Sequence, residues 1–116
     1  MTVLIGRRAL LAAAPVGMLL LAPAFFAPGA RAEDAAVTID NFTFTPATLT
    51  VKAGTRVTWK NEDDIPHTVV SDTAPPLFRS KALDTDDSYS TVFDNPGTYR
   101  YFCGLHPHMT GTIVVQ

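Results

Sequence analysis

From Val37 onward, apolar and polar residues alternate with a period of two, in short runs that turn residues separate. Such alternation is typical of β-strands with one buried face, because successive side chains point to opposite sides of a sheet. No run has the period or the length of a useful helix. The pattern predicts an all-β domain of about seven short strands, which suits a two-sheet Greek-key β-sandwich. The expected strands are Val37–Phe44, Thr48–Lys52, Thr55–Lys60, Thr68–Ser71, Ser88–Phe93, Thr98–Cys103 and Thr112–Val115.

The same alternation predicts which side chains face the core. Val57 and Trp59 share one face of their strand, and Tyr99, Tyr101 and Cys103 share one face of theirs. We therefore expect the thiol to point inward at the end of a strand.

Two segments of the mature chain do not follow the strand pattern. Residues 72–87 contain Pro75-Pro76 and the acidic stretch Asp84–Asp87, and we expect a long, solvated surface connection there. The turn Glu62-Asp63-Asp64 is also expected to be a solvated loop, although such a cluster can attract a basic partner.

Residues 1–32 have the features of an export signal peptide. Arg7 and Arg8 form a basic start, an apolar stretch follows them, and Ala30-Arg31-Ala32 matches the small-x-small cleavage pattern. Cleavage at that point would leave residues 33–116 as one mature domain, and export predicts a periplasmic location.

The apolar stretch has a second interpretation as an uncleaved membrane anchor, because about 20 apolar residues span a bilayer. Pro15 and Pro23 interrupt it, which favours the signal peptide. We therefore expect no stable membrane insertion after cleavage. The adjacent arginines also permit the twin-arginine route, so the sequence leaves the Sec and twin-arginine routes open.

Cysteine content and charge narrow the functional classes. Cys103 is the only cysteine, so no internal disulfide can stabilise this small domain. An unpaired cysteine in an exported chain indicates a reactive or metal-bound thiolate, and a buried inert thiol is the alternative. All eleven acidic residues but only six of the nine basic ones follow residue 32, which gives the mature part a net charge of −5. Nothing in this balance indicates nucleic-acid binding.

The segment after the last tyrosine concentrates side chains that bind metals. Cys103, His106 and Met109 recur at three-residue spacing in a turn with glycine and proline, and His67 is expected to reach them from a neighbouring strand. One thiolate, two imidazoles and a weak thioether are the ligand set of a copper electron-transfer site. We therefore predict that these four residues bind one copper ion, Cu(I) or Cu(II). Zinc also takes cysteine and histidine, but the thioether favours copper.

These residues give the chain a resemblance to the cupredoxin family, and within it to the amicyanins, over nearly all of residues 37–116. It rests above all on the short Cys-x2-His-x2-Met loop with a proline after its histidine. The resemblance implies a type 1 blue copper centre at one end of a β-sandwich, with an exposed histidine surrounded by apolar residues. It also implies a donor dehydrogenase and a cytochrome-like acceptor as redox partners. The matching segments are Val57-Thr58-Trp59, Pro66-His67, Pro96-Gly97-Thr98-Tyr99, Tyr101 and Cys103–Met109.

Three positions depart from the family pattern. Cupredoxins commonly have asparagine after the first histidine and a hydroxyl residue after the cysteine, where this chain has Thr68 and Gly104. The backbone N–H of Thr68 can still reach the sulfur of Cys103, but the side-chain link between the two ligand segments lacks its usual partners. His108 stands where an apolar residue would extend the exposed patch of Pro66, Leu105 and Pro107, and we expect a partly exposed surface histidine.

The predicted function is that of a periplasmic blue copper protein that shuttles single electrons between redox partners, as a monomer. Four ligands leave no open position for a substrate, and three histidines are too few for a multicopper enzyme, so no enzymatic activity is expected. The alternative is a periplasmic copper-binding carrier or chaperone. Phe102, on the strand face opposite Cys103, either covers the sandwich or forms a second contact for electron entry.

Overall fold

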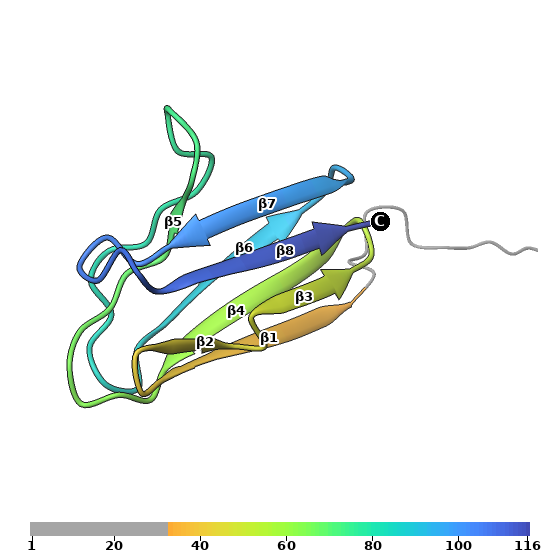
Figure 1. The fold of residues 1–116 in the computed structure, drawn as a ribbon. Coiled ribbons are helices and arrows are strands. Elements are labelled where there is room, and N and C mark those ends of the chain that lie inside the picture. The colour runs from red at the N-terminus through yellow and green to blue at the C-terminus, as the bar shows by residue number, and fades with distance from the viewer. Residues whose placement is uncertain (1–32) are drawn as a thin grey trace, which may run out of the picture. The chain divides into compact units, whose positions relative to one another are not determined.

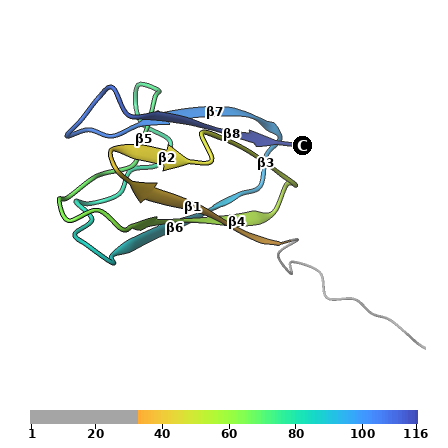
Figure 2. The ribbon, with the colours of Figure 1, turned by 60° about the horizontal axis from the view of Figure 1, so that its bottom comes forward.

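The computed structural model describes residues 33–116, and the predicted signal peptide lies outside these residues. Two four-stranded sheets, ordered β2-β1-β4-β6 and β3-β8-β7-β5, stack face to face (Figures 1 and 2). The predicted all-β sandwich is confirmed, with eight strands in place of about seven. No helix in this part of the chain is long and apolar enough to cross a membrane. The strands are β1 (Asp34–Asp40), β2 (Thr43–Thr45), β3 (Thr48–Val51), β4 (Thr55–Asn61), β5 (Val70–Ser71), β6 (Ser88–Phe93), β7 (Gly97–Phe102) and β8 (Thr110–Val115).

The eighth strand arises because the expected strand Val37–Phe44 is broken. Asn41 and Phe42 have positive φ angles of 52° and 56°, and they form a two-residue turn between β1 and β2, in which Asp40 pairs with Thr43. Turns with two positive φ angles match the twist of paired strands and usually contain glycine. This turn has no glycine to mark it, and the prediction of one continuous strand was wrong.

Both sheets are mixed. β1 pairs in parallel with β4, and β3 pairs in parallel with β8, while the other pairs are antiparallel. The chain therefore crosses between the layers, as expected for a Greek-key arrangement. The segments that carry the predicted ligands lie at one end of the sandwich (Figure 1).

The core lies between the sheets and is rich in aromatic side chains. Trp59 and Tyr101 are almost completely buried and meet edge to face, with ring centroids 5.3 Å apart. Phe44 contacts the same tyrosine at 4.8 Å. Val57 and Cys103 are also buried, so the predicted inward faces of both strands are confirmed.

The predicted solvated connection over residues 72–87 was only partly correct. Its ends are exposed, but Ser80 and Leu83 are buried. Leu83 exchanges both backbone hydrogen bonds with His67, at 3.1 and 2.7 Å, and the N–H of Ser80 bonds the carbonyl of Val69 at 2.8 Å. The segment therefore supports the backbone around His67. Single buried residues in an irregular segment produce no periodicity, which explains why the pattern missed them.

Candidate metal centre

A tight turn after β7 brings three of the predicted ligands close together. The N–H of Cys103 donates to the carbonyl of Met109 at 3.0 Å, which closes the loop at its base. Inside it, His106 donates to the carbonyl of Cys103 at 3.2 Å, and Met109 donates to that of His106 at 2.9 Å. The loop is therefore fixed by its own backbone, which holds the three residues close to one another.

His67 comes from the connection between β4 and β5, at the same end of the sandwich (Figure 1). Buried Asn61 organises this connection. Its Nδ2 donates to the carbonyls of Ile65 and Leu83, each at 2.8 Å, and its Oδ1 accepts the N–H of Asp63 at 2.9 Å. With the paired backbone of Leu83, these bonds fix the position at which the imidazole enters the core.

The donor atoms of His67, Cys103 and His106 lie within 4.8 Å of one another. The sulfur of Cys103 is 3.7 Å from Nδ1 of each histidine. A trigonal metal with bonds of about 2.0 Å to nitrogen and about 2.3 Å to sulfur would separate these atoms by about 3.7 Å. The three side chains are therefore already spaced for one metal ion.

The fourth predicted ligand, Met109, is buried with 5% of its surface exposed, and it belongs to the same core cluster as Cys103. His67 and Cys103 are fully buried, whereas His106 is partly exposed. His108 is exposed and is not one of the clustered donors, as expected for a surface histidine. A soft thiolate, two imidazoles and a nearby thioether fit a single copper ion.

Asp63 makes a contact that the sequence analysis missed, because its acidic segment was expected to be a solvated loop. Its Oδ2 lies 2.8 Å from Nε2 of His67. The backbone N–H of Phe42 lowers the pKa of this carboxyl to about 2, with smaller contributions in the same direction from Asn41 and His67, while burial opposes the shift. The ionised carboxylate accepts the proton of Nε2, which leaves Nδ1 of His67 free to bind a metal.

Thr68 links the two ligand segments, although the usual side-chain partners are missing. Its N–H donates to the sulfur of Cys103 at 3.3 Å, as expected, and its hydroxyl lies 3.9 Å from the same atom. The same hydroxyl accepts the N–H of Gly104 at 2.7 Å. A side chain at position 104 would begin 3.1 Å from that hydroxyl, so glycine permits the close approach. The sequence could not reveal the bond between the Thr68 hydroxyl and Gly104, because its donor is a backbone N–H.

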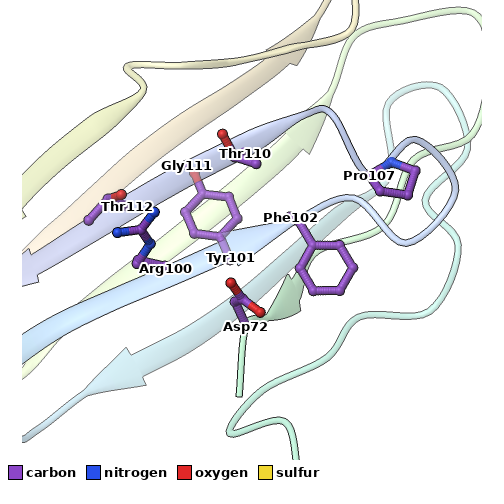
Figure 3. A pocket seen from close by; sticks show the side chains of 8 residues that line it. All are labelled: Asp72, Arg100, Tyr101, Phe102, Pro107, Thr110, Gly111 and Thr112. Atoms are coloured by element: carbon purple, nitrogen blue, oxygen red, sulfur yellow. The ribbon is translucent and has the colours of Figure 1, made fainter. Parts of the chain in front are cut away.

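The surface around the partly exposed histidine is apolar. Leu105 is 51% exposed, and Pro66 and Pro107 are exposed as well. Phe102 is half-buried on the outer face of β7, where it lines a shallow hollow of about 290 Å³ with Arg100 and Thr110 (Figure 3). It thus contributes to the outer surface of the sheet, as its place in the alternation predicted.

Fold and site together define a β-sandwich protein with one copper site. The chain belongs to the cupredoxin-like family, whose domain description matches residues 10–115.

Several named relatives are similar to it. An amicyanin-alpha from Methylorubrum extorquens is 36% identical over 90 residues, covering 75% of this chain and 76% of its own. A plastocyanin from Scenedesmus fuscus is 43% identical over 84 residues, covering 63% of this chain and 86% of its own. The solved structure of a purple cupredoxin from Nitrosopumilus maritimus superimposes with a TM-score of 0.67 at 33% identity, covering 71% of this chain and 99% of that one.

Proposed function

We propose that this chain is a periplasmic type 1 blue copper protein that carries single electrons between redox partners and has no enzymatic activity. The observation that carries this proposal is that the sulfur of Cys103 lies 3.7 Å from Nδ1 of His67 and 3.7 Å from Nδ1 of His106. Together with Met109, these side chains would hold one copper ion, which supplies the one-electron couple when bound.

The residues around the donors support a carrier, because they hold the site in one geometry. Backbone hydrogen bonds close the ligand loop, and the N–H of Thr68 stabilises the charge on the thiolate of Cys103. A site that keeps the same geometry in both oxidation states has a small reorganisation energy, which favours electron transfer. With four donors around the metal, no position is left for a substrate.

The exposed apolar residues Leu105, Pro66 and Pro107 give a surface near the site where a redox partner can dock. By its family resemblance, we expect a donor dehydrogenase and a cytochrome-like acceptor to use it, and the carrier to act as a monomer. Residues 1–32 would direct export and then be removed. Mass spectrometry of the exported protein tests this part, and a mature chain that does not start at Glu33 would contradict it.

The main test is the visible spectrum of the copper-loaded protein. We expect one copper per chain and an intense thiolate-to-copper band in the oxidised form, which Cys103→Ser abolishes, because only a short thiolate bond absorbs so strongly. An oxidised protein with stoichiometric copper but no such band would refute the type 1 site. Copper exchange separates a carrier of electrons from a carrier of copper: the metal must stay bound through many redox cycles, and rapid transfer to a chelator would favour the chaperone.

A further inference from the structure

The turn between β1 and β2 has a backbone conformation that is unusual for its residues. Asn41 and Phe42 both lie at positive φ, 52° and 56°. Asparagine tolerates this region, but a bulky aromatic residue there is an outlier. Such strain persists only where surrounding contacts hold it, and strained residues concentrate at functional sites. The contacts of this turn therefore indicate which residues its unusual conformation brings together.

The carboxylate of Asp63 holds the turn and the first histidine at the same time. Its Oδ1 accepts the N–H of Asn41 at 2.8 Å, and its Oδ2 accepts the N–H of Phe42 at 3.0 Å. Oδ2 also lies 2.8 Å from Nε2 of His67. The side chain of Asp63 is only 12% exposed, so water competes little for these bonds. One ionised group thus fixes the turn relative to the imidazole.

In this position the ring of Phe42 contacts both histidines of the site. Its centroid lies 5.5 Å from that of His67 and 5.0 Å from that of His106, with an interplanar angle of 86° in each case. Each edge-to-face contact of this kind shifts an equilibrium by about 2- to 12-fold. Because the ring contacts both imidazoles and remains 51% exposed, it separates part of their surface from the solvent.

We propose that Phe42 is a positioning residue for the copper centre. Asp63 holds its ring against His67 and His106, which orients both imidazoles before the metal binds and keeps water from the partly exposed one afterwards. This inference rests on the proposed copper function. Apolar cover disfavours the more highly charged oxidised state, so the ring also raises the reduction potential.

Phe42→Gly separates this role from a purely structural one. Glycine adopts the positive φ without strain, and this relief offsets the lost ring contacts and the greater flexibility of glycine in the unfolded chain, so the metal-free protein should unfold at nearly the same urea concentration. The copper affinity, measured by chelator competition, should nevertheless fall about 10-fold, and the potential should fall as well. Phe42→Tyr should preserve both, since it keeps the ring. Leu77→Ala, which truncates another exposed apolar side chain, is the control and should change neither.

Asp63→Asn tests the other half of the arrangement, with Asp64→Asn as a matched control, because Asp64 is an exposed neighbour that loses the same charge. In the metal-free protein, NMR should detect a slowly exchanging Nε2 proton on His67 that Asp63→Asn makes exchange faster and Asp64→Asn leaves unchanged. Copper affinity should fall about 10- to 100-fold for Asp63→Asn alone. Equal effects of the two changes would mean that only charge matters, and would overturn the proposal.

The outcomes also distinguish the two levels of inference. A wild-type protein without a thiolate-to-copper band refutes the proposed function, whatever the variants do. A wild-type protein with that band, whose Phe42→Gly variant keeps its copper affinity and potential, refutes the positioning role alone. Parallel losses of stability and affinity in Phe42→Gly would likewise refute it, because they would indicate a general loss of structure.

Discussion

Gly111 lies opposite Tyr101 in the β7–β8 pair, and we expect that no larger residue can replace it without loss of stability. A Cβ at this position would lie 2.8 Å from Cε1 of Tyr101, and closer still to Cζ and the hydroxyl oxygen. The ring cannot move aside easily, because Trp59 and Phe44 pack against it at 5.3 and 4.8 Å. Gly111→Ala must therefore displace a strand or a buried aromatic ring.

Overpacking a well-filled core usually costs about 1–3 kcal/mol. The atoms met here belong to a rigid ring and not to the end of a flexible side chain, so we expect about 3 kcal/mol, near the top of that range. For a domain of this size each kcal/mol lowers the melting temperature by about 4–8 °C. Gly111→Ala should thus lower it by roughly 12–24 °C.

Urea unfolding of Gly111→Ala, Tyr101→Leu and the double variant measures this directly. If the ring causes the loss, the alanine should cost little once Tyr101 is leucine, and the double-mutant cycle should give a coupling of about 2 kcal/mol or more. A Gly111→Ala variant with the stability of the wild type, or a cycle without coupling, would refute the packing argument.

Two further predictions concern the proposed copper site and its surface. Met109→Gln should still bind copper and keep its colour, but voltammetry should give a lower potential, because a harder oxygen donor stabilises Cu(II); an unchanged or raised potential would exclude Met109 as the axial ligand. Leu105→Glu should slow electron transfer to a partner and self-exchange measured by NMR, with an almost unchanged spectrum, because a charge in a docking surface must be desolvated. Unaffected rates would place the entry point elsewhere, for example at Phe102.

The sequence was most informative where residue type itself carries the chemistry. The spacing of Cys103, His106 and Met109 indicated a metal loop, and the structure brings the first two together with His67. Alternation likewise identified the inward faces of Trp59 and Tyr101, because a period of two has a direct geometric meaning in a strand. Both signals depend only on local spacing along the chain.

The residues that surround the site could not be recognised in this way. In the sequence, Asp63 cannot be told from any other acidic residue in a polar turn. Only in the folded turn, which Asn61 holds, does the carboxylate of Asp63 lie beside His67. The link from Thr68 to Gly104 uses a backbone N–H, which every residue except proline possesses. Phe42 belonged to an apparent strand, since only its φ angle reveals the turn. Contacts of this kind depend on tertiary structure and leave no spacing signal in the sequence.

The buried hydroxyl of Tyr101 should also make the free energy of unfolding fall at alkaline pH. Burial raises the pKa of its hydroxyl from 10.0 to about 12, and the neighbouring Trp59 only partly opposes the shift. Below pH 10 the hydroxyl is neutral in both states and the contribution to stability is complete. Between pH 10 and 12 the unfolded chain ionises this group while the native core excludes the charge, so stability falls by roughly 2–3 kcal/mol.

Tyr101→Phe isolates this contribution. The hydroxyl has no well-formed hydrogen bond within the described residues, so its removal should leave the free energy of unfolding at pH 8 almost unchanged. Urea unfolding at pH 8 and pH 11 should then show a smaller loss for the variant than for the wild type, by about 1 kcal/mol at pH 11. Every other titrating group is common to both proteins and cancels in the difference. Equal losses would mean that Tyr101 reaches water before it ionises, and that the aromatic core around it opens more readily than its packing implies.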